Sequence, residues 1–154
     1  MKELEKYHLL LAEVKQKIVS AQLKAALSVN TEMIFLYWQI GNSIANQQAK
    51  KGWSSGIIPR LAKDLKAEFP DMKGYSERNL GYMLRFAKEY PDNSILQQPV
   101  AKLPWGHNIL LIEKIKDQEL RFWYAKNCIE NNWSREVLDL NKIAVTQKAR
   151  KYHF

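Results

Sequence analysis

Cysteine, glycine and proline are scarce in this 154-residue sequence, which contains one, six and five of them, respectively. The single cysteine, Cys128, excludes an intramolecular disulfide and fits a reducing compartment. Because Cys128 lies among aromatic and apolar neighbours, we expect a packed thiol rather than a reactive one. No stretch approaches the roughly 20 apolar residues of a membrane span, and the N-terminus lacks the apolar run of a secretory signal. We therefore expect a cytoplasmic protein.

Motifs for catalysis are also missing. The sequence has no glycine-rich phosphate loop and no nucleophile elbow. Its acidic residues are scattered beside lysines, as on solvated helix faces, and do not form a pattern of paired catalytic carboxylates. Three histidines without cysteine or acidic residues nearby predict no metal site. We therefore expect no enzymatic activity, no cofactor and no metal from this chain alone.

The spacing of apolar residues predicts an all-α fold. Strand-like alternation is absent, and apolar residues recur every three or four positions. We expect a helical bundle that contains a helix-turn-helix or winged-helix-like unit. Residues 92–103 are the least regular segment, which we interpret as a loop with at most a short helical turn. If the fold contains a wing hairpin, we expect it only in this segment.

Residues 1–29 are predicted to form a long heptad helix. Its seam steps by alternating threes and fours through Leu4, Tyr7, Leu11, Val14, Ile18, Ala21, Ala25 and Ser28. Such a seam predicts pairing with another helix, either in a second copy of the chain or in a hairpin. Asn30 or Thr31 is expected to start a second helix. Residues 30–141 then form a helical DNA-binding-like domain, and residues 142–154 form a basic tail that begins a linker.

Three predicted helix starts share an aromatic residue followed by serine. The pairs are Trp53–Ser54, Tyr75–Ser76 and Trp133–Ser134. In each pair the serine is expected to serve as N-cap and the aromatic residue as part of a hydrophobic staple. The first of these helices is expected to stop at Phe69–Pro70, and the second runs from Ser76 to Tyr90. Asp117 is expected to cap a further helix.

Basic residues outnumber acidic ones by 24 to 16, and the resulting net charge of +8 suits a polyanionic partner. Residues 50–88 hold nine basic and four acidic side chains. The two helices in this region are interpreted as a helix-turn-helix-like unit, in which Ser76–Tyr90 is the candidate recognition helix and Asn79 a candidate reader of adenine. The residues expected to contact DNA are Arg60, Lys63, Lys66, Lys73, Ser76, Arg78, Asn79, Tyr82 and Arg85. A solvated basic face would show the same pattern, so both interpretations remain open.

Several motifs occur in an order typical of one protein family. They are Leu36–Gly41, Gly52–Trp53, Leu61–Leu65, Phe69–Ser76, Arg78–Leu80, Tyr82–Met83, Leu103–Asn108, Trp123–Ala125 and Trp133–Ser134. This string, which runs from about Leu27 to Leu140, resembles the N-terminal domain of the YhcG-like family.

The resemblance implies a helical, winged-helix-like DNA-binding module of a nuclease-associated bacterial protein of restriction or mobile-element type. In that family the domain usually precedes a PD-(D/E)XK-type nuclease domain, whose acidic residues have no counterpart here. DNA and the nuclease domain are therefore the implied partners. The alternative is a homo-oligomerisation domain with an incidental basic surface. Trp105, His107 and Asn108 are candidates for a ligand or domain contact, with a role in the fold as the other interpretation.

Overall fold

A computed structural model of the chain describes residues 2–51 and 56–141. The elements follow in the order α1 (Glu3–Lys51), α2 (Ile57–Glu68), α3 (Glu77–Glu89), the 3-10 helices η1 (Asn93–Gln97) and η2 (Pro99–Lys102), α4 (Trp105–Lys114) and α5 (Gln118–Asn131). A further helical segment covers 135–141. The predicted all-α class is confirmed, since the described residues contain no strand.

Residues 92–103 form η1 and η2 in place of the tolerated wing hairpin. Asp92 caps η1 by accepting a hydrogen bond from the Ser94 amide at 3.0 Å. Pro99 begins η2, where it has no amide hydrogen to donate to a neighbouring strand. The two short helices bury Ile95 and Val100 in the core, so this segment is a packed connection rather than an exposed wing.

Helix α1 is a single element of 49 residues, and at 1.5 Å per residue it is about 74 Å long. The predicted second start at Asn30 or Thr31 is therefore wrong. The side chain of Asn30 donates to Lys102 O at 3.0 Å, and Thr31 Oγ1 donates to Leu27 O at 2.9 Å within the helix. Neither side chain acts as an N-cap, and no glycine or proline precedes Gly41 to interrupt the helix.

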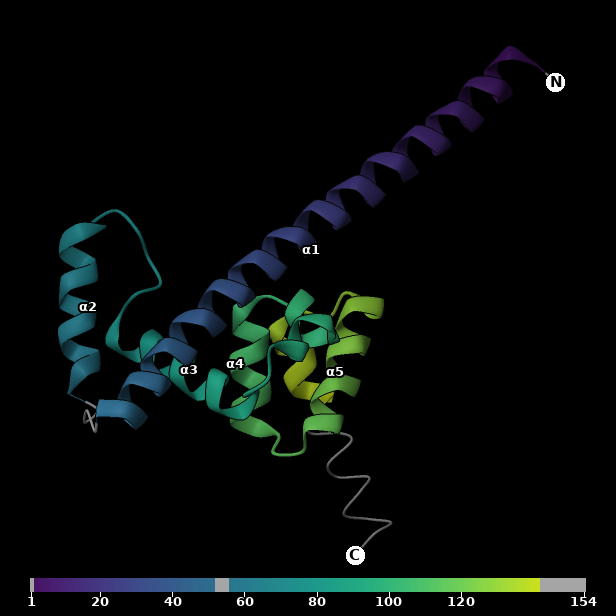
Figure 1. The fold of residues 1–154 in the computed structure, drawn as a ribbon. Coiled ribbons are helices and arrows are strands. Elements are labelled where there is room, and N and C mark those ends of the chain that lie inside the picture. The colour runs from purple at the N-terminus through teal and green to yellow at the C-terminus, as the bar shows by residue number, and fades with distance from the viewer. Residues whose placement is uncertain (1, 52–55, 142–154) are drawn as a thin grey trace, which may run out of the picture.

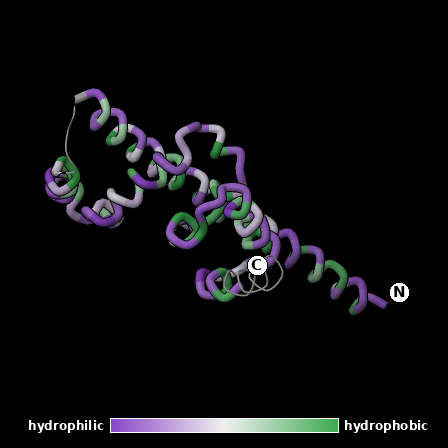
Figure 2. The backbone as a smooth tube through the Cα atoms, turned by 90° about the horizontal axis from the view of Figure 1, so that it is seen from below, coloured by the Kyte–Doolittle hydropathy of each residue, from purple (hydrophilic) through white to green (hydrophobic). Residues whose placement is uncertain are grey.

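The two halves of α1 have different surroundings. From Leu27 onward the helix packs on the rest of the protein, whereas its first half extends away from the other elements (Figure 1). The predicted hairpin is not formed, because the heptad segment continues directly into the packed half. Hydrophobic residues recur along α1 out to its free end (Figure 2).

The core lies between the second half of α1 and helices α3, α4 and α5. In the larger cluster, Ile34 and Trp38 of α1 pack with Phe86 of α3 and with Tyr90 directly after that helix, and Trp38 Nε1 donates to Tyr90 O at 2.7 Å. The smaller cluster holds Tyr37, Ala62, Leu80 and Met83 and fixes α2 against α1 and α3. Helix α3 contributes to both clusters, so its orientation is set from two sides.

Local capping explains the positions of the helices. The Asn79 amide donates to Ser76 Oγ at 3.2 Å and the Val137 amide donates to Ser134 Oγ at 3.2 Å, which confirms both predicted serine caps. Asp117 occupies the N-cap position of α5, but its side chain makes no capping hydrogen bond. Gly56 is the N-cap residue of α2. The predicted start at Trp53–Ser54 and the tail at 142–154 lie outside the described residues.

Candidate nucleic-acid interface

A groove between α2 and the connection to α3 brings together four of the predicted DNA-contacting residues. Lys63 and Lys66 come from α2, Lys73 from the connection, and Ser76 from the start of α3. The groove has a volume of about 660 Å³, and its wall also carries apolar side chains such as Leu65 and one acidic residue, Glu77. All three lysines are exposed, and the ion pairs found among the described residues involve other side chains.

The sequence builds this groove by simple local rules. Helix α2 turns Ala62 and Leu65 toward α1 and α3, which leaves Lys63 and Lys66 on the outside. The chain then leaves the helix through Phe69, whose amide donates to Leu65 O at 2.8 Å. Residues 69–76 form a connection longer than the three or four residues of a tight helix-turn-helix. Gly74, at a φ of 106°, makes its turn in a conformation that favours glycine.

Arg60 lies apart from the lysine groove. It lines a second, mainly apolar hollow between α1 and α2, together with Asp64 of the same helix. Asp64 brings a carboxylate to the same wall, which reduces the positive potential that Arg60 offers there. The structure therefore does not join Arg60 to the lysines.

Arg78 and Tyr82 face α4 instead of the groove. Arg78 Nη2 donates to the Tyr82 hydroxyl at 3.3 Å, and that hydroxyl donates to Glu113 Oε1. Arg78 remains exposed, so its guanidinium is available to a ligand. Tyr82 is held in the fold by an acidic partner that would oppose an approaching phosphate.

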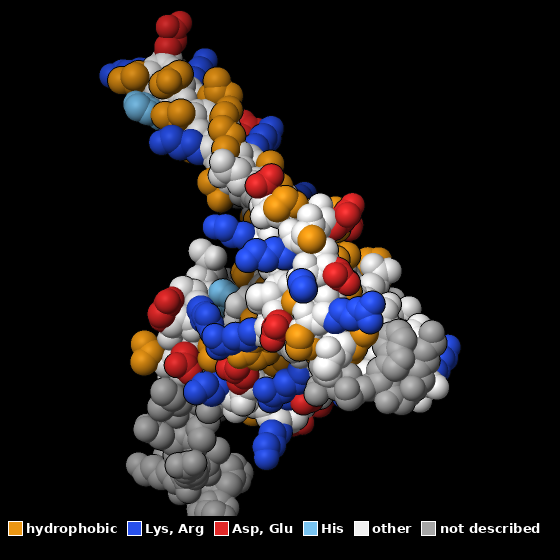
Figure 3. Space-filling model, turned by 90° about the vertical axis from the view of Figure 1, so that its left-hand side faces the viewer, with side chains coloured by type: hydrophobic (Ala, Val, Ile, Leu, Met, Phe, Trp, Pro, Cys, Tyr) orange, Lys and Arg blue, Asp and Glu red, His pale blue; other side chains and the backbone are white. Residues whose placement is uncertain are grey.

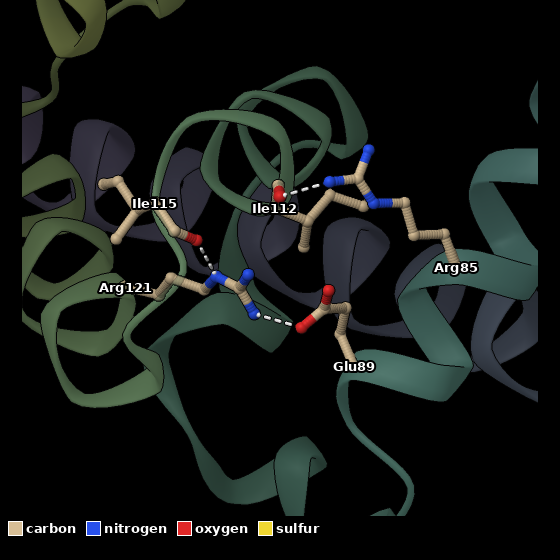
Figure 4. A network of polar contacts seen from close by, with 5 residues as sticks. All are labelled: Arg85, Glu89, Ile112, Ile115 and Arg121. Carbon is tan, nitrogen blue, oxygen red and sulfur yellow. Dashed lines mark hydrogen bonds and ion pairs between the residues drawn. The ribbon is translucent and has the colours of Figure 1, made fainter.

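Arg85 has a role in the fold that the sequence did not indicate. Its Nη2 donates to Ile112 O at 2.9 Å, so it satisfies a carbonyl in the last turn of α4. Figure 4 shows this contact beside a second arginine, Arg121, which donates to Ile115 O and pairs with Glu89. Arg85 is exposed, so this role in the fold stands beside the predicted contact to DNA.

Asn79 does not present a free amide to a base. Its Nδ2 donates to Gly74 O at 2.6 Å, and its Oδ1 accepts from Trp105 Nε1 at 2.6 Å. Recognition of adenine requires the same amide edge. Asn79 and Trp105 therefore tie the start of α3 to the start of α4, and a contact with adenine would require these two hydrogen bonds to break.

His107 and Asn108 also contact other parts of the chain. His107 Nε2 lies 2.8 Å from Trp133 O, and Asn108 is fully buried with its Nδ2 donating to Val100 O at 2.9 Å. These contacts fasten α4 to η2 and to the segment that follows α5. They favour the structural interpretation of this segment over a ligand contact.

A comparison with protein families identifies the chain. The DUF1016 N-terminal domain matches residues 13–148. The chain belongs to the DUF1016 N-terminal domain family. This match confirms the resemblance to the YhcG-like N-terminal domain. No curated protein and no solved structure matches the chain.

The match to the DUF1016 N-terminal domain starts inside the first half of α1, so part of the protruding segment lies within the matched region. None of the helices in the described ranges combines the length and the apolar content that a bilayer crossing requires. Residues 2–51 and 56–141 also contain no group of three or more His, Cys, Asp or Glu side chains placed to hold a metal ion.

Cys128 of this DUF1016 N-terminal domain is buried, as the sequence predicted. Burial raises the pKa of its thiol to about 11. At neutral pH the group is therefore a protonated thiol, which is neither a nucleophile nor a metal ligand. Its packing in the larger core cluster accounts for its position.

Proposed function

We propose that this chain is a DNA-binding module that holds the phosphate backbone of duplex DNA along the groove of Lys63, Lys66 and Lys73. The observation that supports this proposal is the convergence of three exposed ammonium groups, from α2 and the following connection, on one hollow. Phosphate contacts of this kind fix a protein on DNA without reading its sequence. Each one releases condensed counterions, which drives binding at low salt.

The start of α3 supports the same assignment. Ser76 opens this helix at the edge of the groove, and the exposed Arg78 follows in the first turn. In helix-turn-helix proteins, side chains near the start of the recognition helix contact base edges. Arg78, which lies outside the groove beside Tyr82, is the residue of this unit that we propose for a base or phosphate contact. Asn79, Tyr82 and Arg85 hold the helix in place for it.

In this proposal the module has no catalytic activity of its own. The sequence offers no catalytic motif, and the resemblance implies a nuclease domain that follows it in full-length relatives. The module then delivers that nuclease domain to DNA.

Fluorescence anisotropy with a labelled duplex tests the proposal. The parent is expected to bind at about 50 mM salt and to lose affinity steeply toward about 200 mM. Replacing Lys63, Lys66 and Lys73 together by alanine is expected to lower the slope of log K against log salt by about 2.7, since each phosphate contact contributes about 0.9.

The matched control replaces Lys102, Lys114 and Lys116, three exposed lysines that do not line the groove, by alanine. This variant has the same net charge as the groove variant and is expected to keep most of the parent's affinity. Equal losses in both variants would mean that overall charge, not the groove, attracts DNA. A parent that binds no duplex at low salt would rule out the proposed function.

A further inference from the structure

The first half of α1 exposes a complete heptad seam. Leu4, Tyr7, Val14 and Ile18 are 67 %, 57 %, 42 % and 52 % exposed, and Leu11 between them is half-buried. Figure 3 shows hydrophobic side chains along this projecting segment, well away from the rest of the protein. A two-stranded coiled coil needs apolar positions over three or more heptads, and this seam extends from Leu4 to Ala25.

We propose that this seam pairs with the same seam of a second copy of the chain, in an antiparallel coiled coil that sets Leu11 opposite the partner's Val14. This inference concerns self-association and stands independently of DNA binding. The occupant and its orientation follow from the sizes of the seam residues and from the charges beside them.

The antiparallel register matches large residues with smaller ones. Placing Leu11 against the partner's Val14 also places Tyr7 against the partner's Ile18 and Leu4 against the partner's Ala21. The two-fold axis repeats each of these layers once. Alternating larger and smaller side chains across an interface lets the layers interdigitate.

A parallel pair would stack each residue on its own copy. Tyr7 would then meet the partner's Tyr7, while Ala21 and Ala25 would each meet a second alanine. The tyrosine layer near the free end would then be overfilled, and the alanine layers nearer the packed half of α1 would be underfilled. Underfilled layers lose packing contacts. The seam therefore favours the antiparallel arrangement.

The residues beside the seam agree with this orientation. The position directly before the first apolar residue of each heptad lies beside the seam. It is occupied in turn by Glu3, Leu10, Lys17 and Lys24. In the antiparallel register Glu3 faces the partner's Lys24 and Leu10 faces the partner's Lys17, whose aliphatic stem can cover it. Lys17 already pairs with Glu13 of its own helix at 3.2 Å.

On the opposite side of the seam, the antiparallel register sets His8 against the partner's Lys15, and this contact favours neither orientation. In a parallel pair the same positions would combine Lys17 with the partner's Gln22 and Leu10 with the partner's Lys15. No such contact joins a lysine to a carboxylate. The antiparallel pair therefore joins a glutamate to a lysine at each of its two ends. The parallel pair joins no lysine to a carboxylate at these positions.

Sedimentation velocity tests the self-association. The parent is expected to sediment as a dimer, and Val14→Glu with Ile18→Glu is expected to be monomeric because each dimer would bury four carboxylates. The control is Leu9→Glu with Val19→Glu, which makes the same change at positions that are 61 % and 63 % exposed but lie off the seam. A monomeric parent, or a dimer that survives in the seam variant, would overturn the proposal.

Cysteine crosslinking tests the orientation. A mixture of Glu3→Cys and Lys24→Cys chains, treated with a short bifunctional maleimide, is expected to give crosslinked dimers, whereas each variant alone is not. A parallel pair would separate Glu3 from the partner's Lys24 by about 32 Å along the axis, beyond the reach of the reagent, so the mixture would give no crosslinked dimer. That result would refute the antiparallel register. The parent, whose one cysteine is buried, supplies the background.

Discussion

The guanidinium of Arg121 donates from Nη1 to Glu89 Oε2 at 3.0 Å, and this ion pair links α5 to α3. The same group donates from Nε to Ile115 O at 2.6 Å and lies 5.6 Å from the centre of the Tyr90 ring. Arg121 is only 2 % exposed. An arginine stays charged when buried, so these contacts replace the water that it loses on folding. One side chain thus joins the end of α3, the end of α4 and the start of α5.

Replacing Arg121 by methionine is expected to destabilise the protein by about 2–3 kcal/mol. This is less than the ~3–5 kcal/mol typical of breaking a fully buried pair, because the Glu89 side chain is 36 % exposed and can be hydrated. Urea unfolding followed by circular dichroism measures the change. Combining Arg121→Met with Glu89→Leu is expected to recover part of the loss, because no carboxylate is then left unpaired. A single variant as stable as the parent would show that the pair contributes nothing.

Two glycines offer a test of helix packing with opposite expected signs. A Cβ built on Gly41 would lie 2.0 Å from Met83 O, so α1 and α3 touch through their backbones at this point. Gly41→Ala must push the helices apart and is expected to cost about 3 kcal/mol or more. A Cβ on Gly81 of α3 would meet nothing within 4 Å, so Gly81→Ala is expected to stabilise by about 0.5–1 kcal/mol.

Thermal or urea unfolding of both variants checks this contrast. Gly81→Ala controls for the general preference of helices for alanine, which applies equally to both positions. If Gly41→Ala were as stable as the parent, the close approach of α1 to Met83 would be wrong. That result would also question the position of the long helix on the body.

Features that depend on neighbouring residues could be predicted from the sequence. The Ser76 and Ser134 caps and the helix end before Phe69 each depend on contacts within four residues. The continuity of α1 could not be predicted in this way. Asn30 has the chemistry of an N-cap, and only its contact with Lys102, 72 positions away, shows that its amide is used elsewhere.

The candidate site shows the same limit. Sequence patterns identified Lys63, Lys66 and Lys73 as exposed, because the outer face of a helix and a turn are recognisable locally. The partners of Asn79 and Arg85 lie 26 and 27 positions away, on a helix whose placement the pattern does not specify. The buried role of Arg121 could not be predicted, because a single arginine between apolar residues is equally typical of a helix surface.

Arg78 and Arg85 are expected to respond differently to replacement by alanine. Arg78→Ala should leave stability within ~0.5 kcal/mol, because its side chain is exposed and its hydrogen bond to the Tyr82 hydroxyl lies at the surface. Arg85→Ala should cost about 1 kcal/mol, since it removes a hydrogen bond from a charged donor to Ile112 O. Urea unfolding measures both, and anisotropy should show the larger loss of DNA affinity for Arg78→Ala. The reverse order of DNA affinities would place the contact surface nearer Arg85.

The buried thiol of Cys128 predicts a pH-dependent contribution to stability. Its pKa rises from an ordinary 9.0 to about 11 in the folded protein, because burial disfavours the thiolate. The unfolded chain therefore loses the proton first as pH rises. The stabilisation is present in full below about pH 9 and is lost between about pH 9 and about pH 11.

Urea unfolding of the parent and of Cys128→Ala across this range measures the effect. Tyrosines and lysines that titrate in the same range are common to both proteins, so they cancel in the difference. The parent's advantage over the variant is expected to shrink above about pH 9, and a thiol reagent should react with the folded parent slowly at neutral pH and quickly once urea unfolds it. Rapid labelling of the folded protein at neutral pH would mean that Cys128 is accessible and that its pKa is not raised by burial.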